Sequence, residues 1–295
     1  MIKRTVEISR AAAHLSVRHS QLTVRRDGQT IGSIPCEDIA TVVVDHPQVT
    51  YTHGALASLA ESGATVVVCG RNHLPAAMVL PLSDHSQVVW RIHEQLAVGA
   101  PLKKQLWKQL IQAKIRAQAA NLPEDSASHK KLHALAKLVR SGDPANVEAR
   151  AARVYWAHWL PDQPFRRDPE LQGINSMLNY GYAVVRASIA RALVASGLLP
   201  AIGLHHCNRS NAFCLADDLV EPIRPMVDEQ VRKLHLLGYT DLCPETKAFL
   251  LEILAAKVRT GDGTGPLMVG LQLMVGSLTR CYRKEAKGLE IPVAC

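Results

Sequence analysis

The sequence predicts an α+β protein in which a small N-terminal β-rich domain precedes a large all-α domain. Residues 1–84 contain short runs of β-branched residues separated by turn signals, whereas residues 85–295 carry apolar residues at helical spacing. The boundary falls in the segment 80–84, where Pro81 and Ser83 interrupt both patterns. A chain of 295 residues is long enough to bury the cores of two domains.

Short strands account for most of the first domain. Four runs rich in β-branched residues are expected to be strands: 22–25, 30–34, 41–44 and 64–69. Asp27-Gly28 separates the first two runs, and this dipeptide is a strong signal for a tight hairpin turn. Residues 52–62 lie between the last two runs and are predicted to form one short helix.

The second domain is predicted to contain an amphipathic helix with a basic face over residues 101–121. Leu102, Leu106 and Leu110 form its apolar stripe. The same segment contains no acidic residue and five cations: Lys103, Lys104, Lys108, Lys114 and Arg116. Such a face either binds phosphates without reading sequence or is simply solvated. The glycine-rich residues 261–266 lack the Gly-Lys-Ser/Thr of a phosphate-binding loop, and we interpret them as a mobile connection.

Composition narrows the function classes. The net charge of +8 favours a polyanionic partner, whereas an aromatic content of only 4% argues against a protein that stacks single-stranded bases. The 7 cysteines include no Cys-x-x-Cys pair, which argues against a zinc finger and favours reduced thiols. No apolar run is long enough to span a membrane and the N-terminus does not resemble a signal peptide, so we expect a cytoplasmic protein.

Acidic and imidazole side chains are concentrated in one short part of the second domain. His205 and His206 precede Asp218 and Glu221, which would share one face of a helix because they are three residues apart. Further upstream, Glu148 stands near two arginines. Carboxylates and an imidazole on a basic protein suggest a hard divalent cation and a phosphate substrate. Individually, these residues are also explained by surface ion pairs, helix caps or a packed loop.

Three motifs in the same order carry a family resemblance. They are Glu148-Ala149-x-x-Ala152-x-x-Tyr155-Trp156, the segment 175–182, and the segment 206–224. Together they resemble the CRISPR-associated spacer-acquisition integrase/endonuclease, the first-numbered protein of those systems. The type II-like variant is the most similar, because it carries the Asp-Leu-x-Glu-Pro-x-Arg-Pro pattern found here at 218–225. The resemblance extends along the whole chain.

The resemblance implies a catalytic metal site. The implied ligands of Mg²⁺ or Mn²⁺ are Glu148, His206 and Glu221. Asp218 is a further catalytic position, either beside the ligands or supplementary to them. His205 is the main rival of His206, and Asp217 is the weaker rival of Asp218. Asn175, Asn179 and Tyr180 either line this site or serve ordinary helix packing and capping.

DNA contacts are expected from the basic helix and from arginines near the implied ligands. The candidate DNA-binding residues are Lys103, Lys104, Lys108, Arg150, Arg153 and Arg224. For the three arginines, ion pairs on helix surfaces are an equal alternative.

The resemblance also implies a reaction and partners. The expected reaction is insertion of protospacer DNA into a CRISPR array by attack of a 3′-hydroxyl on the repeat phosphodiester. The expected partners are double-stranded protospacer DNA, CRISPR leader-repeat DNA and the small ferredoxin-like adaptation subunit, the second-numbered protein of those systems. The family forms homodimers through the β-rich domain, within a heterohexamer. Two alternatives remain: a non-catalytic DNA-binding scaffold, and a metal-dependent hydrolase of small phosphates, which would need an enclosed pocket.

Overall fold

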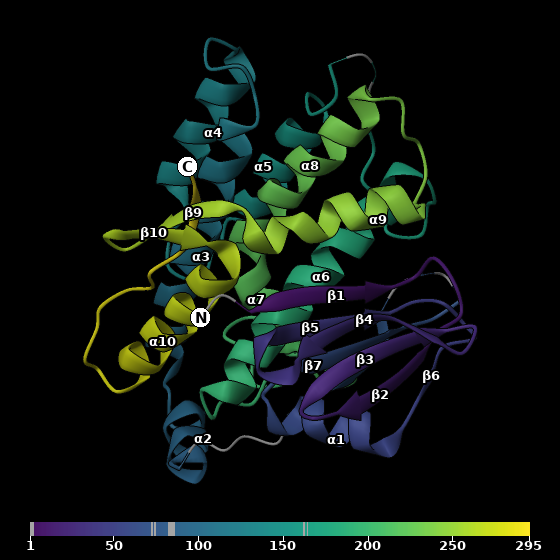
Figure 1. The fold of residues 1–295 in the computed structure, drawn as a ribbon. Helices are drawn as coiled ribbons and strands as arrows, with labels where there is room; N and C mark the ends of the chain where they lie inside the picture. The colour runs from purple at the N-terminus through teal and green to yellow at the C-terminus, as the bar shows by residue number, and fades with distance from the viewer. Residues whose placement is uncertain (1–2, 72, 74, 82–85, 162, 164) are drawn as a thin grey trace.

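The computed structural model describes residues 3–71, 73, 75–81, 86–161, 163 and 165–295. Two N-terminal sheets lie to one side of the helices, and the predicted α+β fold class is confirmed (Figure 1). The predicted boundary at residue 84 lies outside the described residues and stays a prediction. Among the described residues, no helix is long and apolar enough to cross a membrane.

One N-terminal sheet is built around the predicted hairpin. Its strand order is β4-β3-β2-β6, with β2 (His14–Arg18), β3 (Gln21–Arg26), β4 (Gln29–Pro35) and β6 (Thr50–Tyr51). Strands β3 and β4 pair antiparallel, which confirms the expectation for residues 22–25 and 30–34. Asp27 and Gly28 have φ of 49° and 79°, so both adopt the left-handed conformation that a tight hairpin turn requires.

The other N-terminal sheet joins the two domains. Its order is β1-β5-β7-β8, with β1 (Arg4–Ile8), β5 (Ile39–Val44), β7 (Thr65–Cys69) and β8 (Pro75–Val79). All residues of β5 are buried, because Val42 and Val44 pack into the N-terminal core while Val43 packs into the helical core. The predicted short helix is α1 (His53–Glu61), whose N-cap Thr52 accepts a hydrogen bond from the backbone N–H of Ala55.

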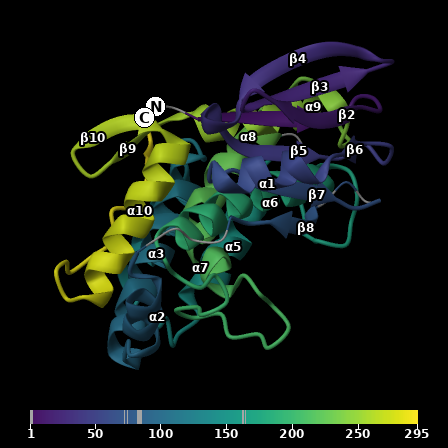
Figure 2. The same ribbon diagram turned by 60° about the horizontal axis from the view of Figure 1, so that its bottom comes forward.

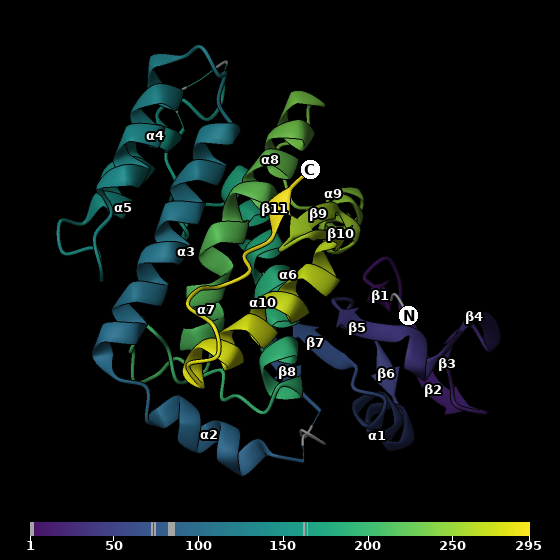
Figure 3. The ribbon, with the colours of Figure 1, turned by 90° about the vertical axis from the view of Figure 1, so that its left-hand side faces the viewer.

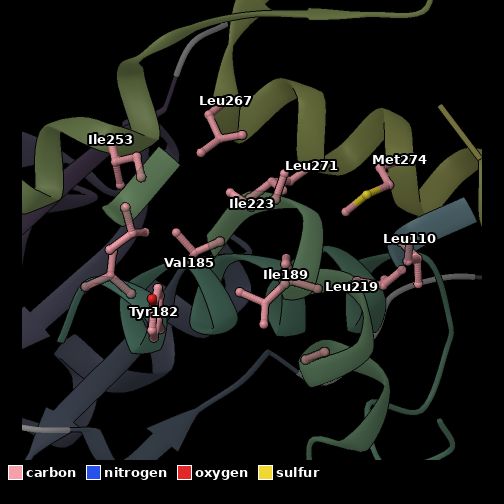
Figure 4. Packing of buried hydrophobic residues seen from close by; sticks show 14 of the residues in the cluster. Leu110, Tyr182, Val185, Ile189, Leu219, Ile223, Ile253, Leu267, Leu271 and Met274 are labelled. Atoms are coloured by element: carbon pink, nitrogen blue, oxygen red, sulfur yellow. The ribbon is translucent and has the colours of Figure 1, made fainter. Parts of the chain in front are cut away.

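Helices form most of the second domain. They are α2 (Val88–Leu96), α3 (Ala100–Ala120), α4 (Ala127–Leu138), α5 (Val147–Trp156), α6 (Ile174–Ala195), α7 (Cys214–Val220), α8 (Arg224–Leu236), α9 (Pro244–Leu251) and α10 (Leu267–Tyr282). Three short 3₁₀ helices are η1 (Cys36–Asp38), η2 (Glu221–Ile223) and η3 (Glu252–Ala255). Helix α6 is central and largely buried, and α10 packs Leu271 and Met274 against its Ile189 side (Figure 4). A Cβ on Gly181 would lie 2.4 Å from Val227 Cγ1, so this glycine permits the close approach of α6 and α8.

A third sheet corrects the expectation of an entirely helical second domain. Its order is β10-β9-β11, with β9 (Lys257–Thr260), β10 (Gly263–Pro266) and β11 (Val293–Ala294). The interpretation of residues 261–266 as a mobile connection is therefore wrong. Gly261 has φ of 57° and begins the turn, and the glycines beyond it form a strand paired with β9. The segment after α10 runs back along the helices to supply β11 (Figure 3).

Polar contacts connect the two domains at the end of β5. Helix α6 lies against β7 and β8 (Figure 2). Buried Asp45 forms an ion pair with buried Lys247 of α9, and His73 lies 3.1 Å from the same carboxylate. Farther along α6, the Arg191 guanidinium donates a hydrogen bond of 2.7 Å to the carbonyl oxygen of Gly63. Helices α6 and α9 are thus fixed to the first domain.

Candidate active site

Glu148 is positioned by the cap of helix α5. The carboxylate of Asp143 accepts hydrogen bonds of 2.9 Å from the backbone N–H groups of Val147 and Glu148. Asn146 is the N-cap, with φ of 46°, and its side chain accepts from Ala149 at 3.4 Å. These caps place Glu148 in the first turn of α5, where the helix dipole favours a carboxylate. The Asp143 turn that breaks the helical pattern in the sequence thus begins the helix that carries Glu148.

Glu221 begins η2, between α7 and α8, and is buried between two cations. Its Oε1 accepts a hydrogen bond of 2.8 Å from Arg224 Nε, and its Oε2 accepts one of 2.5 Å from Lys114 Nζ. Burial alone would raise the pKa of Glu221, but Arg224 and Lys114 outweigh burial and hold this pKa at about 2. The carboxylate is therefore charged at neutral pH, as a metal ligand must be.

Lys114 brings the two predicted acidic ligands together. Its Nζ lies 2.5 Å from Glu148 Oε1 and 2.5 Å from Glu221 Oε2, and only 9% of its side chain is exposed. Burial lowers the pKa of Lys114, but the two carboxylates outweigh burial and raise it. The expectation that Lys114 lies on an exposed basic face is wrong. On α3 it follows Leu110 and Ile111 by four and three residues, so it lies on the buried side.

Asp218 holds the loop that carries His206. Its fully buried carboxylate accepts hydrogen bonds from the backbone N–H groups of Leu204 (2.6 Å), His205 (3.1 Å) and His206 (3.1 Å). The same carboxylate lies 2.7 Å from Nδ1 of the His206 ring. When Nδ1 carries the proton and donates it to Asp218, the lone pair of Nε2 is available to a metal. The hydrogen bond to Asp218 raises the pKa of His206 despite partial burial.

The two adjacent histidines have different environments. His205 stacks on Trp107 of α3 with ring centroids 4.2 Å apart, whereas His206 meets the same indole edge-on at 5.6 Å. Gly203 precedes them, and a Cβ there would lie 2.3 Å from the His206 carbonyl oxygen and 2.9 Å from Asp218 Oδ2. The geometry therefore favours His206 over His205 as the ligand, because only the His206 ring is oriented by a carboxylate.

The remaining residues of the candidate set have structural partners of their own. Asp217 lies 3.6 Å from Arg186 and accepts a hydrogen bond of 2.6 Å from the side chain of Asn211. The side chain of Asn175 accepts from Arg167 Nη1 at 2.9 Å, and Asn179 donates to the Pro169 carbonyl oxygen at 2.8 Å. Asn175 and Asn179 thus hold the segment that precedes α6. Buried Tyr180 lies toward the first domain, near Glu7 and Asp45.

The candidate DNA-binding cations differ in exposure. Lys104, Arg150 and Arg153 are exposed, while Lys103 and Lys108 are half-buried. Arg224 is paired with Glu221 and its guanidinium lies 4.5 Å from the centre of the Tyr182 ring. Which of these residues contacts DNA stays a prediction.

An arginine-lined cavity of about 320 Å³ lies beside Arg224, the hydrogen-bond partner of Glu221, and the sequence analysis did not identify it. Its lining includes Arg167, Arg186 and Arg224, together with Tyr182. Tyr182 in turn donates a short hydrogen bond to the buried carboxylate of Asp228. Three guanidinium groups beside acidic ligands form a suitable environment for phosphodiester oxygens. Tyr182 lies inside the second sequence motif, but nothing in the sequence pattern joins Arg167 to the site.

The donor set fits a hard divalent cation in its chemistry. An ammonium already lies between the carboxylates of Glu148 and Glu221, so this point attracts positive charge. Among the residues described in the structure, no three His, Cys, Asp or Glu side chains are arranged as a complete metal-binding group. Glu148, Glu221 and Nε2 of His206 stay the predicted ligands of such an ion, and the structure brings the two carboxylates onto one position.

Comparisons with known proteins place the chain in a family. The family model described as CRISPR associated protein Cas1 matches residues 6–238. A curated relative, the CRISPR-associated endonuclease Cas1 of Neisseria meningitidis serogroup C (strain 8013), is 35% identical over 283 residues, which cover 94% of this chain and 92% of the relative.

Solved structures share the fold. A casposase bound to its integration product superposes with a TM-score of 0.79 at 21% identity, covering 99% of this chain and 93% of that one. A chain of a Cas6-RT-Cas1–Cas2 complex gives a TM-score of 0.78 at 16% identity, covering 97% of this chain and 35% of that longer one. The family model and the Neisseria relative confirm the resemblance carried by the three motifs, and the chain belongs to the CRISPR-associated Cas1 family.

Proposed function

We propose that this protein is a metal-dependent DNA endonuclease and integrase that inserts protospacer DNA into a CRISPR array by 3′-hydroxyl attack on the repeat phosphodiester. The observation that carries the proposal is the convergence of Glu148 and Glu221 on one cation position. His206, whose ring is oriented by Asp218, would supply the imidazole ligand. The Neisseria relative is named an endonuclease, and the casposase neighbour is bound to an integration product, so both agree with this chemistry.

The chain's own residues would divide the work as follows. Glu148, Glu221 and Nε2 of His206 would hold Mg²⁺ or Mn²⁺, which supplies Lewis acidity to a phosphodiester and lowers the pKa of a bound hydroxyl. Asp218 keeps the His206 ring in the tautomer that leaves Nε2 free. Arg224 keeps Glu221 charged and fixed in place through its hydrogen bond.

Substrate binding would rely on the cations around this centre. The guanidinium groups of Arg167 and Arg186 line the adjoining cavity and would bind phosphate oxygens near the attacked bond. The exposed cations of α3 and α5 would bind more distant phosphates without reading sequence. A hydroxyl at the attacking position gives strand transfer, and water at the same position gives nicking.

The proposed partners are protospacer DNA, CRISPR leader-repeat DNA and the small adaptation subunit Cas2. The complex named above contains Cas1 and Cas2 together, which supports the small subunit as a partner. We propose a homodimer formed through the β-rich domain and a heterohexamer with Cas2, as the family resemblance implies.

A strand-transfer assay tests the proposal. Supercoiled plasmid with a leader-repeat junction is mixed with short duplex DNA carrying free 3′-hydroxyls, the small subunit and Mn²⁺ or Mg²⁺. We expect integration by the wild type that requires metal, is lost in Glu148→Gln and His206→Ala, and survives in His205→Ala as the matched control. Salt-sensitive DNA binding without strand transfer by the wild type would instead indicate the non-catalytic scaffold. If His205→Ala lost strand transfer while His206→Ala kept it, the ligand would be His205 and not His206.

A further inference from the structure

The ammonium of Lys114 lies where the proposed function requires a metal ion. Its Nζ contacts one oxygen of Glu148 and one oxygen of Glu221, each at 2.5 Å. Magnesium binds oxygen ligands at about 2.1 Å, and manganese at a similar distance, so an ion bound to the same two oxygens would overlap the ammonium. The positive charges of the two would also repel each other. The ammonium and the metal therefore exclude one another at this point.

We propose that Lys114 is an internal counter-ion of the metal site, which joins the two acidic ligands in the metal-free protein and must be displaced before a divalent ion binds both. This inference rests on the proposed metal-dependent function. It assigns to Lys114 a positioning role, and it makes metal binding an exchange of one cation for another. The apparent affinity for metal then depends on the ligands and on the strength of the two hydrogen bonds from Lys114 to Glu148 and Glu221 that must be broken.

The surroundings of Lys114 allow such an exchange. Glu221 keeps Arg224 on its other oxygen, so it stays partly neutralised and held in place when the ammonium leaves Oε2. The side chain of Glu148 is 32% exposed, so one of the two acids is in contact with solvent. A lysine also suits this role, because its compact charge sits on a flexible four-carbon stem. A purely structural ion pair would not need to open toward solvent at one of its two acids.

A titration with Mn²⁺ alone, followed by electron paramagnetic resonance of the free ion, tests the inference on the full-length protein. We expect Lys114→Met to bind Mn²⁺ at least about tenfold more tightly than the wild type, because no charge-assisted hydrogen bond has to be broken. Without metal this variant leaves one oxygen of Glu148 and one of Glu221 without their ammonium partner, so its melting temperature should fall, and Mn²⁺ should restore more of it than in the wild type. Lys131→Met, at an exposed position of α4, is the matched control and should equal the wild type.

A second measurement uses the wild type and does not depend on the folding of a variant. Amine acylation followed by mass spectrometry should label Lys114 faster with saturating Mg²⁺ than without it, while labelling of Lys131 stays constant. Equal or weaker Mn²⁺ binding by folded Lys114→Met, or unchanged labelling of Lys114, would overturn the inference and leave the proposed function intact. If neither the wild type nor any variant bound Mn²⁺, the metal dependence of the proposed function would fail as well.

Discussion

Asp218→Asn changes one oxygen of a buried acceptor and should disturb both the fold and the site. The wild-type carboxylate accepts three backbone N–H groups and the Nδ1–H of His206. Its Oδ1 serves both donors of His206, and its Oδ2 serves Leu204 and His205. An asparagine of the same shape keeps one acceptor oxygen and directs an NH₂ group at the other two donors. Two of the four hydrogen bonds are lost when the NH₂ group replaces Oδ2. When it replaces Oδ1, the backbone bond of His206 is lost, and the ring keeps its contact only in the tautomer in which Nδ1 accepts and Nε2 carries the proton.

The magnitude follows from this count. A hydrogen bond to a charged group contributes about 1.5–3 kcal/mol, so losing two in a fully buried place should lower the free energy of unfolding by about 3 kcal/mol. The orientation of the His206 ring is lost as well. Removal of such an outer partner of a ligand typically costs 10–100-fold in metal affinity or activity, and we expect Mn²⁺ affinity to fall by about that factor.

Urea unfolding and the Mn²⁺ titration measure the two effects. Asp217→Asn is the matched control, since its carboxylate is only partly buried and its ion pair with Arg186 spans 3.6 Å, and we expect it to cost less than about 1 kcal/mol. A cost below about 1 kcal/mol for Asp218→Asn, together with unchanged Mn²⁺ affinity, would refute the assignment of Asp218 as the residue that orients the loop.

Three further expectations concern the surrounding structure. Gly203→Ala should lower the melting temperature and abolish strand transfer, because its Cβ would lie 2.3 Å from a carbonyl oxygen; wild-type activity in this variant would show that the loop has another conformation. Burial raises the pKa of Asp228 from 3.8 to about 7, so the native state binds the proton more tightly than the unfolded chain does. Stability should therefore fall as the pH rises from about 4 to about 7, and urea unfolding of Asp228→Asn across this range should show a smaller decrease. Lys247→Met leaves buried Asp45 with only the half-exposed His73 as a partner and should cost about 3 kcal/mol in urea unfolding, whereas adding Asp45→Asn to it should recover part of that loss; no recovery would mean that the pair is not coupled.

Part of the N-terminal fold follows from local sequence patterns, whereas strands β2, β6 and β8 were not predicted. The strands β3, β4, β5 and β7 and the helix α1 coincide with runs of β-branched residues, an Asp27-Gly28 turn and a Thr52 cap. The β9-β10-β11 sheet did not follow, because β10 is rich in glycine and its stability comes from pairing with β9 and from β11 some thirty residues away. A run of glycines on its own predicts a flexible segment, and here the pairing with β9 makes the run a strand instead.

Residue types in the candidate site could be predicted, but their partners could not. The motifs named Glu148, His206 and Glu221, and the structure brings the first and last onto one ammonium. Lys114 was predicted to be exposed because lysine is charged, although its position on the helix is on the buried side. Its spacing from Leu110 and Ile111 on α3 was the available signal for burial. The hydrogen bonds of Asp218 depend on how residues 203–206 fold back over α7, and no spacing rule supplies that path.

Strand β5 belongs to two cores at once, and this has a consequence for cooperativity. Val42 and Val44 stabilise the first domain, while Val43 and its neighbour Val67 on β7 are part of the helical core. A fragment cut between the domains would expose the second face of this sheet as an apolar surface, and would tend to aggregate. Denaturant should therefore unfold both domains in one transition, and any rearrangement of the catalytic helices on DNA would carry the N-terminal sheets with it as a rigid unit.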